Sequence, residues 1–253
     1  MRTVLITGAS SGIGASCAQV LAKEGNYRLI LCARRADRLE TLRNEIQAQY
    51  PNIDIHTFTL DVRDNEKVKE AIASLPLEWQ NVDILINNAG LSQGLDPLQD
   101  GDTDDWDRMI DTNVKGLLYV SKAVIPLLKK STHAHIVNIG SIAGKEVYPN
   151  GNVYCATKHA VDALNKAMRI DLLSFGIKVT AINPGMVETE FSEVRFKGDK
   201  EKAKNVYTGV VPLSGTDIAD TISFVLSRPA HVNINDLLIM PTAQATGSIV
   251  NRK

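Results

Sequence analysis

Short apolar runs alternate with longer stretches of helical periodicity along the whole chain. Runs that are almost entirely apolar and rich in β-branched residues are typical of strands buried on both faces, as in a parallel sheet. The intervening stretches have the apolar spacing of helices that cover such a sheet. The pattern predicts an α/β fold with a doubly wound parallel sheet and helices on both faces. Strands are expected at residues 4–7, 28–33, 53–59, 84–87, 135–139, 179–182 and 237–240, and helices at 13–23, 38–50, 66–74, 104–130, 154–174 and 217–226.

The size and composition of the chain exclude several classes of protein. Its 253 residues are enough to bury one large core, and no repeat or Pro/Ser-rich linker divides them, so we expect one domain, residues 1–253. The formal net charge of −1 offers no basic surface for nucleic acid, and no apolar run is long enough for a membrane. The three cysteines form no metal-ligand pattern, and no secretory signal precedes the first expected strand. We therefore expect a cytoplasmic protein without a metal site.

A glycine-rich loop, Thr7-Gly8-Ala-Ser-Ser-Gly12-Ile-Gly14, connects the first expected strand to the first expected helix. Gly8 permits a tight turn, Gly12 lets backbone N–H groups approach a pyrophosphate, and Gly14 allows close packing of the helix on the strand. The N-terminus of a helix also favours an anion. The loop therefore predicts a dinucleotide site, to which we assign Gly8, Ser10, Ser11, Gly12, Ile13 and Gly14.

The end of the second expected strand indicates which ribose the cofactor carries. An acid at this point would bind a free 2′-hydroxyl, whereas this chain has Arg34 and Arg35, with no acid before Asp37. Two guanidinium groups suit a 2′-phosphate, which they can bind by charge-assisted hydrogen bonds. The residues thus favour NADP over NAD, with Ser10 as a further phosphate contact. A solvated basic turn is the alternative interpretation.

Two more patches follow expected strands. Asp61 and Val62 come after the third strand, where an acid and the next backbone amide can bind the edge of an adenine. Asn88, Ala89 and Gly90 come after the fourth strand, and their small side chains would let a cofactor lie against the backbone. Both patches are also ordinary turn sequences, so by themselves they leave their function open.

A tyrosine and a lysine four residues apart, Tyr154 and Lys158, fall on one face of an expected helix. An ammonium group close to a phenol favours the phenolate, so we expect Lys158 to lower the pKa of Tyr154 and make it an acid/base group near neutral pH. Ser141 follows the fifth expected strand and could place its hydroxyl beside the phenol. Alone, such a pair is more often a surface stripe than a catalytic site.

One segment, residues 186–212, interrupts the alternation of strands and helices. It is charged, contains no strand pattern and follows a strand C-terminus, where ligands bind in parallel sheets. We therefore expect a lid over the substrate. Within it, Arg195 stands between Val194 and Phe196, a setting more typical of a pocket wall than of a solvated run. Arg195 is our candidate anchor for a substrate carboxylate; the alternative is a lid helix whose charges pair with one another.

Taken in order, these motifs resemble those of the short-chain dehydrogenases/reductases. The resemblance covers essentially the whole chain. It implies a Rossmann-type sheet of seven strands and a homotetramer built on the two long helices, 104–130 and 154–174. The matching residues are the loop 7–14, Asp61, Asn87 to Gly90, Asn113, Ser141, Tyr154, Lys158, Pro184 and Gly185.

The resemblance also implies roles. Tyr154 would exchange a proton with the substrate oxygen, to which Ser141 would hydrogen-bond, and both would bind substrate. Lys158 would bind the nicotinamide ribose, and Asn113 would support a water relay from Lys158 to solvent. Tyr154, Pro184, Gly185, Val187 and Thr189 would complete the cofactor site.

Three stretches show a narrower resemblance, to the NADP-dependent 3-hydroxy acid dehydrogenases: residues 142–149, 188–198 and 204–207. It implies an oxidoreductase that acts on serine, allo-threonine, 3-hydroxyisobutyrate or 3-hydroxypropionate, or in reverse on malonic semialdehyde. Two other functions stay open at this point. One is a carbonyl reductase for a bulkier ketone or a 3-oxoacyl thioester, and the other is a nucleotide-binding protein without catalysis.

Overall fold

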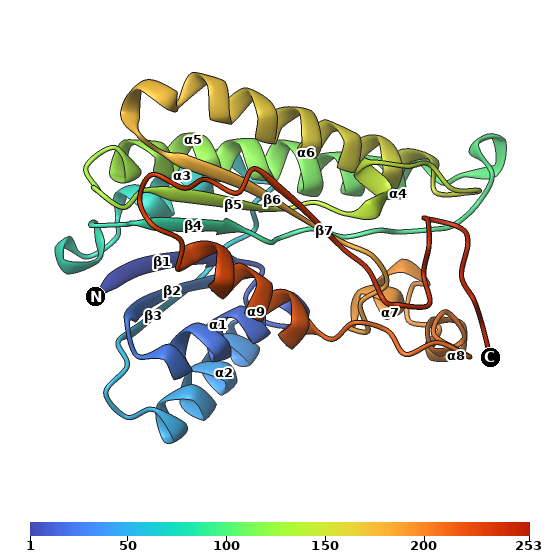
Figure 1. Ribbon diagram of the computed structural model, residues 1–253, viewed down its shortest axis with the longest axis horizontal. Helices are drawn as coiled ribbons and strands as arrows, with labels where there is room; N and C mark the ends of the chain where they lie inside the picture. The colour runs from blue at the N-terminus through green and yellow to red at the C-terminus, as the bar shows by residue number, and fades with distance from the viewer.

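The seven apolar runs form one parallel sheet in the computed structural model, which describes residues 1–253. The strand order is β3-β2-β1-β4-β5-β6-β7, so the chain winds outward from β1 in one direction and then from β4 in the other (Figure 1). The predicted fold and the strand number are confirmed. The strands are β1 (Arg2–Thr7), β2 (Tyr27–Ala33), β3 (Ile55–Thr59), β4 (Ile84–Asn87), β5 (His135–Ile139), β6 (Lys178–Pro184) and β7 (Asp236–Ile239).

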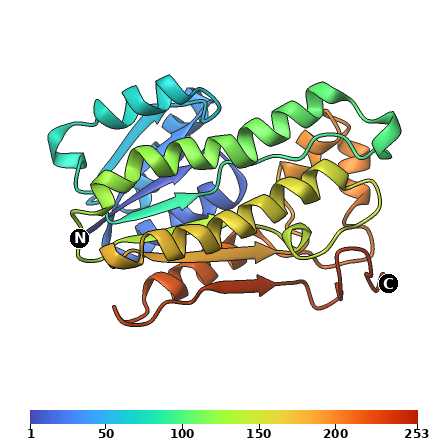
Figure 2. The ribbon, with the colours of Figure 1, turned by 90° about the horizontal axis from the view of Figure 1, so that it is seen from above.

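Helices cover both faces of the sheet (Figures 1 and 2). One face carries α1 (Gly12–Glu24), α2 (Ala36–Gln49) and α9 (Gly215–Leu226), whose apolar residues share a core with one set of strand side chains. The other face carries α3 (Asn65–Ala73), α5 (Leu117–Leu128) and α6 (Asn152–Asp171), which form a second core with the alternate strand side chains. Because the strands are buried on both faces, they are almost continuously apolar.

The reversal of strand order creates a crevice between β1 and β4. Neighbouring strands there carry connections to opposite faces of the sheet, so the loops that follow them separate and leave room for a ligand. Three short helices stand at this C-terminal edge of the sheet: α4 (Thr103–Ile110), α7 (Phe191–Arg195) and α8 (Lys200–Asn205). The C-terminal tail folds back beside α7 and α8 (Figures 1 and 2).

Two expected elements differ from the structure. The helix expected at 104–130 is not regular, since a π-helical segment, Asp111–Gly116, joins α4 to α5. Such segments are wide turns that periodicity in the sequence does not distinguish from an α-helix. The long expected helix at 154–174 is α6 followed by a short 3₁₀ turn, Leu173–Phe175, that ends at Gly176 with a φ of 67°.

No helix of the fold combines the length and the apolar composition that a bilayer crossing needs.

Candidate active site

The glycine-rich loop forms a cradle at the N-terminus of α1. Gly8 and Gly12 have positive φ angles of 65° and 54°, where a side chain would be strained. A Cβ on Gly14 would lie 2.5 Å from the Gly8 carbonyl oxygen, so only glycine allows this approach. No acid stands in the first turn of α1, and the side chain of Ser11 does not cap it. The first N–H groups of the helix are therefore available to an anion, and the loop fits the pyrophosphate of a dinucleotide.

A cavity of about 300 Å³ extends from this loop along the C-terminal ends of the strands. It brings together nearly all the residues that the sequence predicts for the site, although they come from seven separate segments of the chain. Three predicted residues do not line it: Gly14 lies behind the loop, Asn113 lies behind Leu91, and Arg195 lies beyond Tyr154. The predicted residues on its wall are Gly8, Ser10, Ser11, Gly12, Ile13, Arg34, Arg35, Asp61, Val62, Asn88, Ala89, Gly90, Ser141, Tyr154, Lys158, Pro184, Gly185, Val187 and Thr189.

Two arginines stand at the end of the cavity that follows β2. Arg35 donates to the hydroxyl groups of Ser10 and Ser11 at 3.3 and 2.9 Å and forms an ion pair with Glu190 at 3.1 Å. Arg34 is exposed on the cavity wall and has no ion-pair partner. Arg38 also pairs with Glu190. Two guanidinium groups thus share one carboxylate and that of Arg34 is unpaired, which leaves a net positive charge that suits a phosphate group.

The carboxylate after β3, that of Asp61, already has partners within the protein. Asp61 forms an ion pair with Arg63, whose Nη2 lies 2.5 Å from its Oδ2, and it accepts a hydrogen bond from the Arg63 backbone N–H at 3.1 Å. The hydrogen bonds from Arg63 hold the pKa of Asp61 below its ordinary value, against the effect of burial. Asp61 is therefore ionised at neutral pH, so it accepts hydrogen bonds and does not donate them.

The asparagines after β4 tie the strands together. Asn88 donates from Nδ2 to the carbonyl oxygens of Thr7 and Gly8 at 2.9 and 3.1 Å, so it holds the glycine-rich loop against β4. Asn87 donates to Asn138 on β5 and to Ser121 on α5, both at 2.9 Å. These bonds fix the floor of the cavity, and turn chemistry alone does not account for them.

Asn113 lies in the π-helical segment and is buried. Its amide exchanges two hydrogen bonds with the backbone of Leu91, each of 2.8 Å, and donates to Thr157 on α6 at 3.0 Å. The wide turn thus turns this polar side chain inward and joins α4–α5 to the loop after β4 and to α6. Both N–H groups of the amide are used within the protein, its oxygen accepts one bond, and the water relay stays a prediction.

Ser141, Tyr154 and Lys158 meet on the cavity wall. The Ser141 hydroxyl accepts a hydrogen bond from the Ala143 backbone N–H at 3.1 Å, so its own proton is free to point into the cavity. Lys158 Nζ lies 5.9 Å from the centre of the Tyr154 ring and donates to the Ile139 carbonyl oxygen at 2.9 Å. The Tyr154 ring packs edge-on against Phe191 of α7, with the ring centres 5.6 Å apart.

The expected lowering of the Tyr154 pKa is wrong for this structure. Burial raises the pKa of the Tyr154 phenol well above its ordinary value, and the nearby Tyr148 adds to this, while Arg195 and Ser141 oppose it. Burial also lowers the pKa of Lys158 to about 8. The sequence pattern shows that the two groups are close, but the loss of water around both is the larger effect.

Arg195 lies over the ring of Tyr154. Its guanidinium carbon is 5.2 Å from the centre of the Tyr154 ring and 5.3 Å from that of Phe191. It donates to the hydroxyl groups of Ser92 and Tyr148, each at 3.0 Å, and it forms no ion pair. By contrast, Lys197 on the same lid pairs with Asp102 and Asp105 at 3.2 and 2.8 Å. Carboxylates outside residues 186–212 therefore neutralise Lys197, whereas no carboxylate pairs with Arg195.

Sequence reasoning missed several residues of the site. Glu190, Phe191 and Val194 line the cavity, and Ser92 and Tyr148 hold Arg195. A local signal existed only for Phe191 and Val194, whose spacing of three is that of one face of a short helix. The others act through partners far away in the chain, which no local pattern reveals.

The family model for short chain dehydrogenase matches residues 2–200. An NADP-dependent 3-hydroxy acid dehydrogenase of Schizosaccharomyces pombe is 44% identical over 252 residues, which cover 100% of this chain and 97% of that protein. The chain belongs to the short-chain dehydrogenase family. Like its relatives, this short-chain dehydrogenase is an oxidoreductase.

Two other comparisons bear on the site of this short-chain dehydrogenase. Sulfoacetaldehyde reductase 2 of Chromohalobacter salexigens is 44% identical over 243 residues, 96% of this chain and 95% of that protein. A solved structure of serine dehydrogenase in a closed form, complexed with NADP+, superposes with a TM-score of 0.92 at 42% identity and covers 100% of both chains. Both proteins are thus similar to this chain over nearly their whole length.

Proposed function

We propose that this protein is an NADP-dependent dehydrogenase of small 3-hydroxy acids, such as serine, allo-threonine, 3-hydroxyisobutyrate or 3-hydroxypropionate. The observation that carries the proposal is the position of Arg195, a guanidinium without a carboxylate partner, 5.2 Å from the ring of the tyrosine that would exchange the proton. A 3-hydroxy acid has its carboxylate only two bonds from the carbon that reacts. An anchor and an acid/base group must therefore lie close together.

The residues of the cavity supply the proton half of the reaction. When bound, NADP(H) would supply the hydride chemistry of the alcohol–carbonyl exchange. Ser141 donates its O–H to the substrate oxygen, while its oxygen accepts from the Ala143 N–H. During oxidation Tyr154 takes the hydroxyl proton as the phenolate, and during reduction it returns that proton as the neutral phenol. Its raised pKa makes the neutral phenol the resting form, which is the acid that reduction needs.

The choice of NADP is supported by the charge at the end of the cavity. Arg34 has no ion-pair partner, and Arg35 is held by Ser10 and Ser11 so that its guanidinium faces the glycine-rich loop. A 2′-phosphate carries about two negative charges, which these guanidinium groups can bind by charge-assisted hydrogen bonds. NAD, which lacks this phosphate, would leave that positive charge unbalanced.

A second candidate substrate is an aldehyde that carries a sulfonate. In sulfoacetaldehyde the anionic group is one CH₂ from the aldehyde carbon, as the carboxylate is in malonic semialdehyde. Arg195 could bind either anion, and the relative of that name is 44% identical. A bulkier ketone is less well supported, because Phe191, Val194 and Leu91 restrict the cavity beside Tyr154.

The test is an NADP(H) absorbance assay with 3-hydroxy acids, sulfoacetaldehyde and matched alcohols or aldehydes that lack the anionic group. We expect Arg195→Met to raise KM for the anionic substrates about 10- to 100-fold, since a hydrogen bond to a charged group contributes about 1.5–3 kcal/mol. KM for NADP should stay unchanged. Lys204→Met is the matched control, because Lys204 is an exposed lid cation without an ion pair. An unchanged KM in Arg195→Met would refute the anchor.

A homotetramer is also proposed. Large apolar side chains are exposed on and beside the outer face of α5 and α6, among them Leu118, Ile170, Leu173 and Phe175. Exposed apolar residues gathered on two long helices indicate association with another protein surface. Light scattering after size-exclusion chromatography tests this, and a monomer at micromolar concentration would contradict it.

A further inference from the structure

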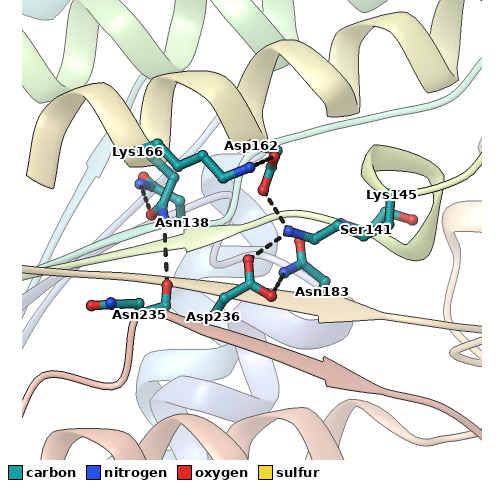
Figure 3. A network of polar contacts seen from close by, with 9 residues as sticks. Asn138, Ser141, Lys145, Asp162, Lys166, Asn183, Asn235 and Asp236 are labelled. Atoms are coloured by element: carbon teal, nitrogen blue, oxygen red, sulfur yellow. Dashed lines mark hydrogen bonds and ion pairs between the residues drawn. The ribbon is translucent and has the colours of Figure 1, made fainter.

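Lys145 connects three elements around the catalytic residues (Figure 3). Its Nζ lies 2.5 Å from Asp162 Oδ1 on α6 and 2.6 Å from Asp236 Oδ2 on β7. Lys145 itself belongs to the loop that follows β5. Asp162 is one helical turn beyond Lys158, and its side chain is only 13% exposed. A single ammonium group therefore joins the loop to the helix that carries Tyr154 and Lys158.

The loop that carries Lys145 also carries Ser141, so the position of Lys145 affects that of Ser141. A 3₁₀ turn, Ile142–Gly144, separates them, and the N–H groups of Gly144 and Lys145 donate to the carbonyl oxygens of Ser141 and Ile142, both at 2.9 Å. The turn packs directly on α6, since a Cβ on Gly144 would lie 2.6 Å from the Lys158 carbonyl oxygen. The segment 141–145 is thus short and internally bonded, so its two ends move together.

Asp236 supports Ser141 by a second route. It accepts a hydrogen bond from Asn183 Nδ2 at 3.2 Å, and the Asn183 Oδ1 accepts from the Ser141 N–H at 3.3 Å (Figure 3). Asn183 is buried in β6, and a Cβ on Gly140 would lie 2.0 Å from its Oδ1. The carboxylate thus fixes the Asn183 amide with its oxygen toward Ser141.

From these contacts we propose that Lys145 is a positioning residue, whose ion pairs with Asp162 and Asp236 hold the Ser141 hydroxyl in register with Tyr154 and Lys158. The proposal rests on the role of Ser141 in the proposed function but does not depend on which hydroxy acid is the substrate. Lys145 touches neither the cavity nor its contents. It acts on the reaction through the loop 141–145 and through Asp236 and Asn183, which contact Ser141 from the other side.

Loss of the ammonium group would disturb this geometry in a definite way. Asp162 would keep Lys166 at 2.6 Å as its partner, whereas Asp236 would keep only the Asn183 amide. Two carboxylates that now share one cation would face each other without it and repel. The loop would move away from α6 and take the Ser141 hydroxyl with it. A displacement of about 1 Å at a catalytic group can cost about 100-fold in rate.

The experiment compares Lys145→Met with Lys166→Met. Both remove a lysine that pairs with Asp162, but Lys166 is 58% exposed on α6 and has no contact with the loop, so it is the matched control. With the best substrate of the panel, we expect kcat to fall about tenfold or more in Lys145→Met. KM for NADP should be unchanged, Lys166→Met should have wild-type kcat, and Lys145→Arg should recover most of the activity.

A double-mutant cycle with Ser141→Ala separates positioning from a general loss of stability. If Lys145 acts through Ser141, Lys145→Met should cost less than twofold in kcat once the hydroxyl is gone, because effects on one path are not additive. An equal fall of kcat in both backgrounds, or a lower thermal midpoint with wild-type kcat, would overturn the proposal. A wild-type kcat in Ser141→Ala alone would instead contradict the proposed function, so the two failures are distinguishable.

Discussion

The buried charge of Lys158 should lower the free energy of unfolding of this protein, and replacing Lys158 with methionine should raise it. Burial lowers the pKa of Lys158 from 10.5 to about 8, which means that folding disfavours its charged form. Methionine has a similar length and shape and needs no water around its end. We therefore expect Lys158→Met to be more stable than the wild type at pH 7, although it should lose turnover.

The magnitude follows from the pKa. A change from 10.5 to about 8 corresponds to about 3 kcal/mol of unfavourable free energy at pH 7. The variant also leaves the Ile139 carbonyl oxygen without its donor, which costs about 1 kcal/mol. A net gain of about 2 kcal/mol should raise the Tm of a chain of this size by about 4–8 °C.

The dependence of this stability difference on pH shows whether the charge of Lys158 causes it. The penalty is complete below the folded pKa of about 8, fades between about 8 and 10.5, and is absent above 10.5, because there the lysine is neutral in both states. Thermal unfolding of the cofactor-free protein at pH 7 and pH 10 should therefore show a Tm gap that nearly closes at pH 10. Lys204→Met, which removes an exposed lysine, should show no gap at either pH. A variant that is no more stable at pH 7, or a gap that persists at pH 10, would refute the reasoning.

Three further changes test other parts of the site. Tyr154→Phe removes the proposed proton donor, so kcat should fall by about 100-fold or more, with NADP affinity within about twofold. Intact turnover would exclude Tyr154 as the acid/base group. Arg35→Ala should raise KM for NADP about tenfold and leave KM for NAD unchanged in the same assay; an equal loss with both cofactors would show that Arg35 does not bind the 2′-phosphate. Gly14→Ala places a Cβ 2.5 Å from the Gly8 carbonyl oxygen, so fluorescence titration should show weakened NADP binding, with a stability loss of about 1–3 kcal/mol. Wild-type binding by that variant would contradict the close packing of the loop.

The roles proposed for Ser141, Lys145 and Arg195 all depend on the loop after β5. The loop after β5 carries Ser141 at one end and Tyr148 at the other, and Tyr148 accepts a hydrogen bond from Arg195 at 3.0 Å. The segment that carries Ser141, proposed to bind the reacting oxygen, therefore also supports Arg195, the proposed carboxylate anchor. Lys145 lies between them in the same loop, and its ion pairs join that loop to α6 and β7.

Much of the fold was predictable because its signals are local. The strands are almost continuously apolar, since a doubly wound sheet buries both of their faces, and the predicted runs agree with the observed strands within about two residues. The glycine-rich loop was recognisable because backbone geometry requires glycine at Gly8 and Gly12, where φ is positive. Tyr154 and Lys158 share a helix, so their spacing alone places them on one face.

Other features depend on the tertiary structure, because they are formed by contacts between residues that are distant in the chain. In the π-helical segment, Asn113 is held by the backbone of Leu91, which donates one hydrogen bond and accepts another, and by the Thr157 hydroxyl, which accepts a third. The partners of Lys145 lie 17 and 91 residues further along the chain. No spacing in the sequence indicates either arrangement.

The pKa of Tyr154 shows most clearly what the sequence determines and what the tertiary structure determines. The sequence by itself determined that a phenol and an ammonium group stand one helical turn apart, and from this an acidic phenol follows. Only the packing of Phe191 and the neighbouring apolar residues decided how much water is removed from the ring. The pKa of Tyr154 is raised because the loss of hydration destabilises the phenolate more than the nearby positive charges stabilise it.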